Sequence, residues 1–234
     1  MEHTLNVKSV IHSFGKKQIL SDINFTCKTG DVIGIFGRNG TGKSTLLKIL
    51  FGTLKATHST IYIDNRLLEK KLPLNALIAY HHQEVFLPKN LTVRNLIALY
   101  FPEEEKQNKI FYDTRINKIE KLKAGVLSTA EQRYLQFLLI VNSEQHFILL
   151  DEPFSMVEPL YKELIKEKIE TYKYNKGFII TDHYCQDVLQ VANIKKVIRD
   201  GVMMSVDQNS DLVNFGYLSS NSKIKLNKQD TFKR

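Results

Sequence analysis

Residues 37–45 read GRNGTGKST, which is a complete GxxxxGK[ST] phosphate-binding loop. The apolar run VIGIF precedes it at residues 32–36 and the helix-like run LLKILF follows at 46–51, so the strand, loop and helix that this motif requires are all present. Glycines let the backbone wrap round a phosphate, and several N–H groups then point at it together with the positive end of the helix. The sequence therefore predicts a nucleoside triphosphate site. A Gly-rich turn before an ordinary helix is the weaker alternative.

Each residue type in this loop has its own role in binding a nucleotide. The ammonium of Lys43 is suited to neutralising β- and γ-phosphate oxygens, and the hydroxyl of Ser44 is suited to binding Mg²⁺. The other positions supply the backbone cradle, and we expect them to contact the phosphates: Gly37, Arg38, Asn39, Gly40, Thr41, Gly42 and Thr45.

Length and composition are those of a packed globular protein. The chain has 234 residues, of which 43% are hydrophobic, which suits one large domain or a domain with a subdomain. Cys27 and Cys185 lie far apart with no CxxC pair, so we expect neither a disulfide nor structural zinc and interpret both as buried thiols in a reducing compartment. No stretch approaches the roughly 20 apolar residues of a membrane span. We therefore expect a cytosolic protein, or one held at a membrane by something else.

An excess of basic residues, 33 against 25 acidic ones, gives a net charge of +8. Such a charge could serve a nucleic acid or an anionic membrane surface and does not decide between them. Part of the excess lies in residues 219–234, which hold five Lys or Arg and one Asp. We expect this basic tail to be a solvated, disordered terminus rather than a lipid or RNA contact.

The order of apolar runs predicts an α/β fold. Alternating apolar residues at 5–10 and 19–25 flank a turn and indicate an antiparallel hairpin. Further strands are expected at 59–64, 77–80, 147–150 and 178–181, with a second hairpin at 197–206. Helices are expected at 91–101, over 109–141 with a break at 125–129, and along a face formed by Leu160, Leu164, Ile165, Ile169 and Tyr172, whereas 103–106 is expected to be a charged loop.

Strands that alternate with helices indicate a mostly parallel sheet. The N-terminal antiparallel strands and a helical segment at about 88–140 are then additions to that sheet. Because such a sheet binds ligands at the carboxyl ends of its strands, we expect the phosphate loop and the ends of the later strands to meet there.

Hydrolysis of a bound nucleotide needs a carboxylate for Mg²⁺, a group that positions water and a donor to the γ-phosphate. Asp151 follows the apolar run FILL at 147–150, where a lone carboxylate is costly unless it serves a cation, and Glu152 comes next. We interpret the pair as a metal-binding acid and a base. The alternative is that both acids cap a helix that begins after Pro153.

The order of these motifs closely resembles the ATP-binding cassette (ABC) ATPases, the nucleotide-binding subunits of ABC transporters. The resemblance covers residues from about 5 to 206; residues 37–45 match the Walker A motif and FILLDEP at 147–153 matches the Walker B motif. It implies an ABC-type P-loop NTPase fold over residues 1–218, with a mostly parallel sheet core, an N-terminal antiparallel β subdomain and an inserted α-helical subdomain.

The resemblance also assigns roles to side chains. It makes Glu152 the catalytic glutamate, Gln83 the Q-loop residue that contacts Mg²⁺ and water, and His183 the switch histidine at the γ-phosphate. Phe14 stands where the family stacks an aromatic ring on adenine, although a core Phe in a hairpin is nearly as good an interpretation. The metal ligands implied are Ser44, Gln83 and Asp151.

Two neighbouring histidines precede Gln83 in the sequence. Adjacent residues on a strand face opposite ways, so His81 and His82 are expected to be structural rather than a pair of metal ligands.

Two loops depart from the family pattern. The family's signature loop reads LSGGQ or LSGGE and closes over the γ-phosphate held by the other subunit, whereas residues 127–132 here read LSTAEQ. Ser128 is retained and is expected to contact the nucleotide. Thr129 and Ala130, however, bring Cβ atoms to positions where the backbone must approach the phosphate closely. We therefore expect the binding of ATP between two subunits to be weaker or altered. The loop after Walker B reads SMVE at 155–158, with glutamate in place of the family's aspartate.

The resemblance thus implies an ATPase subunit that uses ATP and Mg²⁺. It implies a homodimer, or a heterodimer with another ABC subunit, and separate transmembrane permease subunits at the cytoplasmic face of the membrane. The lost glycines keep a second hypothesis open, an ATP-binding module with little hydrolysis that acts as a regulatory or structural partner. We favour the first because Glu152 is retained.

No nucleic-acid partner is expected, because the ABC proteins of DNA repair and of ribosomes need a long coiled coil or two cassettes, which 234 residues cannot hold.

Overall fold

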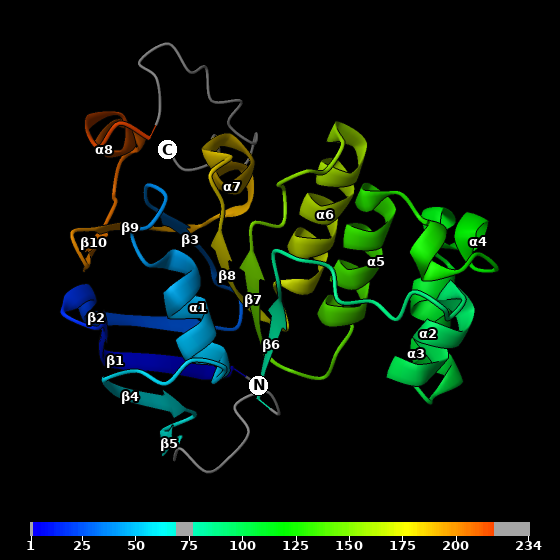
Figure 1. Cartoon of the computed structure of the whole chain (residues 1–234), viewed down its shortest axis with the longest axis horizontal. Coiled ribbons are helices and arrows are strands. Elements are labelled where there is room, and N and C mark those ends of the chain that lie inside the picture. The colour runs from blue at the N-terminus through cyan, green and yellow to red at the C-terminus, as the bar shows by residue number, and fades with distance from the viewer. Residues whose placement is uncertain (1, 69–76, 218–234) are drawn as a thin grey trace, which may run out of the picture.

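Two β-sheets with helix α1 (Lys43–Phe51) between them form the body of the molecule (Figure 1). The structure is a computed structural model that describes residues 2–68 and 77–217. The first sheet has the order β2-β1-β4-β5, and its neighbouring strands are antiparallel. Its strands are β1 (Thr4–Phe14), β2 (Lys17–Lys28), β4 (His58–Ile63) and β5 (Arg66–Leu67).

The second sheet has the order β10-β9-β3-β8-β7-β6, and its pairs are parallel except for β9 with β10. Every residue of β3, β7 and β8 is buried, which explains why these strands read as continuous apolar runs. The register places both Ile35 and Asp151 beside Thr181, so three strands end together at one edge. Its strands are β3 (Val32–Phe36), β6 (Ile78–His81), β7 (Phe147–Asp151), β8 (Gly177–Thr181), β9 (Ile194–Arg199) and β10 (Val202–Ser205).

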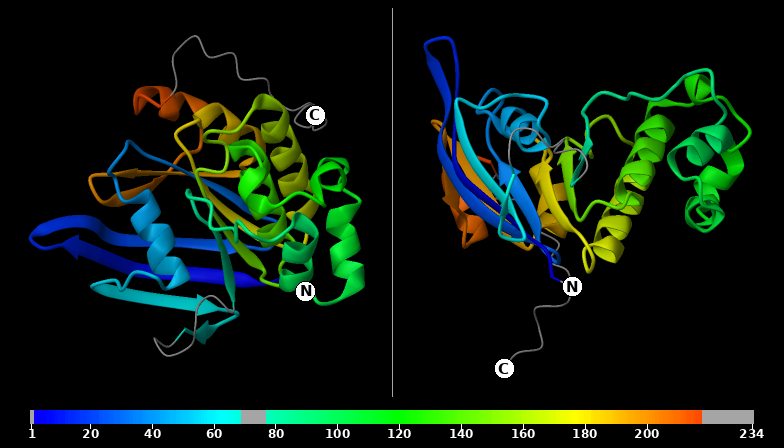
Figure 2. Two further views of the ribbon diagram at one scale, coloured as in Figure 1. Left: turned by 45° about the vertical axis from the view of Figure 1, so that its right-hand side comes forward. Right: turned by 90° about the horizontal axis from the view of Figure 1, so that it is seen from below.

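Helices cover the second sheet and form a separate lobe. Figure 2 shows α2, α3 and α4, the helical lobe, lying beyond α5 and α6 from the sheets. The helices are α2 (Val93–Tyr100), α3 (Glu104–Phe111), α4 (Thr114–Ile119), the 3₁₀ turn η2 (Ala124–Val126), α5 (Thr129–Val141), α6 (Pro159–Tyr172), α7 (Cys185–Val191) and α8 (Asn209–Asn214). No helix within the described residues is both long and apolar enough to cross a membrane.

Apolar packing on both faces of the second sheet holds this edge in place. On one face, Leu46 and Leu50 of α1 are fully buried in a core shared with both sheets. On the other face, α5, α6 and α7 pack on the sheet in a core that continues into the helical lobe. Each fully buried Leu contributes roughly 1.5–3 kcal/mol relative to an exposed one, so the phosphate loop and the strand ends are fixed to a rigid base.

Most of the elements expected from the sequence are confirmed. Both hairpins form, and the second turns at Asp200 and Gly201, whose φ angles are 51° and 78°. The buried strands and α1 lie where the apolar runs predicted them. The helical segment expected at about 88–140 contains α2 to α5, and the basic tail at 219–234 lies outside the described residues.

Four details of the sequence interpretation are wrong. Residues 103–106 are not a charged loop, since α3 starts at Glu104. Acidic residues in the first turn stabilise a helix because its N-terminal end carries a partial positive charge. The helix expected at 91–101 begins only at Val93, since Thr92 caps it by accepting the Asn95 N–H. Leu160 of the expected apolar face is 46% exposed, and the Cys185 thiol is only half-buried, whereas Cys27 is fully buried as expected.

Candidate functional site

The phosphate loop joins β3 to α1 and packs against strand β2 of the first sheet. Gly42 caps α1 with a φ of 99°, and a Cβ there would lie 2.8 Å from side-chain atoms of Ile19 and Leu20 in β2. Only glycine fits this position without a shift. Arg38, Asn39 and Gly40 at the tip of the loop are exposed, so the cradle opens to solvent.

Lys43 folds back over the loop and is only 8% exposed. Its Nζ donates to the carbonyl oxygens of Gly37 at 2.6 Å and Arg38 at 3.2 Å. Burial lowers the pKa of Lys43, and the carboxylates of Glu152 and Asp151 oppose that shift. An ammonium held against neutral carbonyls in a partly desolvated loop is well placed to pair with a phosphate instead.

Asp151 is 2% exposed and is held by three hydroxyl groups. Its Oδ1 accepts from Ser44 Oγ at 3.0 Å and from Thr181 Oγ1 at 2.7 Å, while its Oδ2 accepts from Tyr80 OH at 2.8 Å. The sequence motifs predict no contact of Tyr80 or Thr181 with Asp151, although both residues lie on strands that parallel pairing brings beside β7.

The donor set at Asp151 fits Mg²⁺. A hydroxyl and a carboxylate oxygen 3.0 Å apart are hard ligands that can share one ion. Within the described residues no group of three or more His, Cys, Asp or Glu side chains could hold a metal.

Glu152 is the point where the three predicted catalytic side chains meet. Gln83 Nε2 donates to Glu152 Oε2 at 2.8 Å, and His183 Nδ1 lies 3.4 Å from Glu152 Oε1. The three residues follow β6, β7 and β8 respectively, so the shared edge of the sheet brings them together. The helix-capping alternative for the two acids is wrong, because α6 begins only at Pro159.

Asp182 is a further buried acid of the site, for which the sequence predicts no role. It is 1% exposed, and its carboxylate accepts the Phe154 N–H at 2.9 Å and the Tyr184 N–H at 2.8 Å. Burial raises the pKa of Asp182, while these two backbone bonds oppose the rise. The side chain ties the turn after Glu152 to the turn that carries His183.

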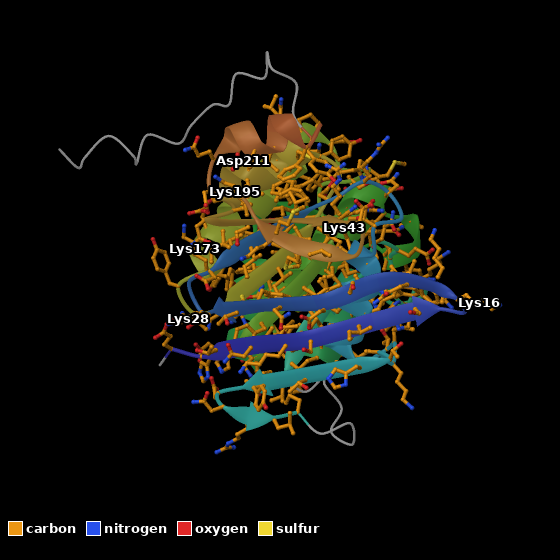
Figure 3. All side chains as sticks on the ribbon, turned by 90° about the vertical axis from the view of Figure 1, so that its left-hand side faces the viewer. Lys16, Lys28, Lys43, Lys173, Lys195 and Asp211 are labelled. Carbon is orange, nitrogen blue, oxygen red and sulfur yellow. The ribbon has the colours of Figure 1, made fainter. Side chains whose placement is uncertain are left out.

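Two expected nucleotide contacts lie on peripheral parts of the site. Phe14 is 55% exposed at the hairpin turn and meets the His12 ring edge-on at 4.6 Å, so it is not a core Phe. Figure 3 shows Lys16 of the same turn at the opposite end of the hairpin from Lys28. Adenine stacking by Phe14 stays a prediction.

Ser128 begins α5 with a capping box. Its Oγ accepts the Glu131 N–H at 3.2 Å, and the Glu131 carboxylate accepts the Ser128 N–H at 2.8 Å. The side chain is exposed, so it can face a partner.

The two histidines before Gln83 differ in burial. His81 is 1% exposed, whereas His82 is half-buried and packs its ring 4.0 Å from that of Tyr80. The two rings therefore face different surroundings, and a structural role for both stays a prediction.

Residues 20–155 match the family model described as ABC transporter. The galactose/methyl galactoside import ATP-binding protein MglA of Treponema denticola is 31% identical over 86% of this chain, which spans 43% of that relative's length. The lipopolysaccharide export system ATP-binding protein LptB of Haemophilus influenzae is 28% identical, with 90% of this chain and 92% of that one covered. A solved ATP-binding cassette of an ABC transporter has a TM-score of 0.75 and 26% identity, with 88% and 90% of the two chains covered.

Proposed function

The chain belongs to the ABC transporter family and is one of its ATP-binding, ATP-hydrolysing subunits, and we propose that Glu152 positions the attacking water during hydrolysis. The observation that supports this most is the convergence of Gln83 and His183 on the Glu152 carboxylate, at 2.8 Å and 3.4 Å. Contacts with an amide and an imidazole fix the orientation of the Glu152 carboxylate. A group that positions a water molecule for attack needs such a fixed orientation.

The phosphates of ATP are proposed to sit in the loop at 37–45. Lys43 would leave its two carbonyl partners and pair with β- and γ-oxygens, and the backbone N–H groups would complete the cradle. Ser44, Asp151 and the amide oxygen of Gln83 would hold Mg²⁺, which when bound neutralises charge on the phosphates. His183 would donate to the γ-phosphate, next to the Glu152 carboxylate that it approaches at 3.4 Å.

We propose that the active form is a dimer in which Ser128 of one subunit closes over the nucleotide of the other. Several apolar side chains that are close in sequence to Ser128, Glu152 or His183 are exposed in the single chain, and such a contact would cover them: Val126, Met156, Leu160 and Tyr184. The capping box at Ser128 holds this end of α5 rigid for such a contact.

A permease contact is proposed at a cavity of about 500 Å³ between β6, the end of α5 and the loop from α2 to α3. Its lining is mainly apolar and includes Phe51, Tyr80, Phe101 and Ile140. Tyr80 also donates to Asp151, so the cavity wall is one side chain away from the proposed metal site. A membrane subunit docked there would place the protein at the cytoplasmic face of the membrane.

Phosphate release by the purified protein tests the catalytic assignment. Glu152→Gln keeps the shape of the side chain but removes its charge, and we expect turnover to fall by at least about 100-fold with MgATP still bound. Lys43→Ala should instead abolish MgATP binding in a calorimeter. A wild-type protein that releases no more phosphate than Glu152→Gln, with its permease present, would contradict the assignment.

A further inference from the structure

We propose that Arg133 is a positioning residue for ATP hydrolysis, acting with Gln136 to hold the Gln83 segment (residues 82–86) against Glu152. The inference rests on the proposed function of Glu152 and extends it to the buried face of α5. Neither side chain touches the expected place of the nucleotide, so both would act through Gln83 and Glu152.

Arg133 joins the two loops that carry the catalytic pair. Its guanidinium donates from Nη2 to the Gln83 carbonyl oxygen at 2.8 Å and from Nη1 to the Glu152 carbonyl oxygen at 3.4 Å. Because the same planar group contacts both backbones, it fixes the distance between them. That distance decides whether the Gln83 amide can reach the Glu152 carboxylate.

Gln136 lies one helical turn further along α5 and holds the rest of the segment. Its Nε2 donates to the carbonyl oxygens of His82 at 3.2 Å and Glu84 at 3.4 Å, while its Oε1 accepts the Phe86 N–H at 3.0 Å. Backbone groups on both sides of Gln83 are therefore bonded to one helix.

The burial of these polar side chains supports a positioning role. Arg133 is 8% exposed and Gln136 is 6% exposed, on a helix whose other buried positions are almost all apolar. Burial lowers the pKa of Arg133, and the negative charges of Glu152 and Asp182 oppose that shift. A buried cation is weak evidence for stability, because an apolar side chain would pack there at less cost, but it does fix geometry.

The test compares Arg133→Met with Lys176→Met. Lys176 is an equally buried cation, 8% exposed, whose Nζ also donates to two backbone carbonyls, those of Ser143 and Gln145, but at the far end of α5. We expect Arg133→Met to lower kcat about tenfold or more with the MgATP Kd within about twofold of wild type. Lys176→Met should leave kcat within about twofold of wild type. Arg133→Lys can reach only one of the two carbonyls, so its kcat should lie between those of wild type and Arg133→Met.

A double-mutant cycle shows whether Arg133 acts through Gln83. In a Gln83→Ala background, Arg133→Met should lower kcat by a clearly smaller factor than it does in the wild type, because the Gln83 amide that Arg133 positions is gone while its contact with the Glu152 carbonyl remains. Losses that multiply, or an equal loss in Lys176→Met, would overturn the proposal.

Hydrogen exchange tests without activity whether α5 holds the segment, directly at the Phe86 N–H that Gln136 accepts and indirectly, through loosening of the segment, for the carbonyls that Arg133 binds. Peptides covering residues 82–86 should exchange faster in Arg133→Met and in Gln136→Met but not in Lys176→Met, and unchanged exchange in all three would overturn the proposal. If wild type releases no more phosphate than Glu152→Gln, the proposed function fails, whereas the exchange result still decides whether α5 holds the segment.

Discussion

Replacing His81 with leucine should reduce the loss of stability that this fold shows between pH 7 and pH 5. His81 ends β6, is 1% exposed and lies against α5, with its ring centroid 6.4 Å from that of Phe137. Burial lowers the pKa of His81 from 6.5 to about 4, and the positive charge of Arg133 contributes in the same direction. The ring is therefore neutral in the folded protein at neutral pH.

The sign and the magnitude follow from proton linkage. The unfolded chain takes up a proton at His81 near pH 6.5, but the folded chain does so only near pH 4, so between these values the unfolded state binds more protons. The free energy of unfolding therefore falls as the pH falls through this window. With about 1.36 kcal/mol for each pKa unit, the full loss is roughly 3 kcal/mol, of which about 2 kcal/mol is reached by pH 5.

Urea unfolding at pH 7 and pH 5 measures this loss. The chain has no Trp, so far-UV circular dichroism is the signal. His81→Leu should lose about 2 kcal/mol less stability than wild type between the two pH values. His58→Leu, at an exposed position at the start of β4, is the control and should behave as wild type. If wild type and His81→Leu lose the same stability, the His81 ring is not buried in its neutral form and the reasoning fails.

Two further predictions concern the partner surfaces. Thr129→Gly should raise turnover, because Thr129 is exposed at the start of α5, where its Cβ can obstruct the partner's nucleotide. Ala130→Gly should not raise turnover, because Ala130 is only 5% exposed. Each glycine also destabilises the helix by up to about 1 kcal/mol. Equal phosphate release by the two variants would contradict this. Tyr100→Glu, at a cavity residue that is 49% exposed, should abolish co-purification with the permease but leave phosphate release by the isolated protein unchanged; a permease that stays bound would exclude this cavity as its site.

The sequence predicted the parts of the fold that depend on local pattern. Unbroken apolar runs such as 147–150 and 178–181 identified the buried strands because both faces of the sheet are covered. Motif order then predicted which strand ends carry Asp151, Glu152 and His183, since the carboxyl ends of parallel strands share an edge.

Contacts between distant segments could not be predicted in the same way. No local pattern marks Asp182 as a contact residue, yet its carboxylate accepts a backbone N–H group 28 residues earlier in the chain. Glu104 looked like part of a charged loop because the amphipathic face of α3 is short, with Ile110 as its buried residue. Arg133 and Gln136 stand three residues apart among the apolar residues of α5, a spacing that puts both on one face of the helix but does not say which backbone they bind.

Helix α5 connects the proposed partner surfaces to the catalytic carboxylate. Its N-cap is Ser128, where the capping box faces the proposed second subunit, and its last turns line the cavity with Leu139 and Ile140. Between these ends, Arg133 holds the Gln83 and Glu152 carbonyls. A rigid helix cannot be displaced at one end without moving the groups bonded to its middle. Closure at Ser128 or binding in the cavity should therefore reach Glu152 through the same guanidinium.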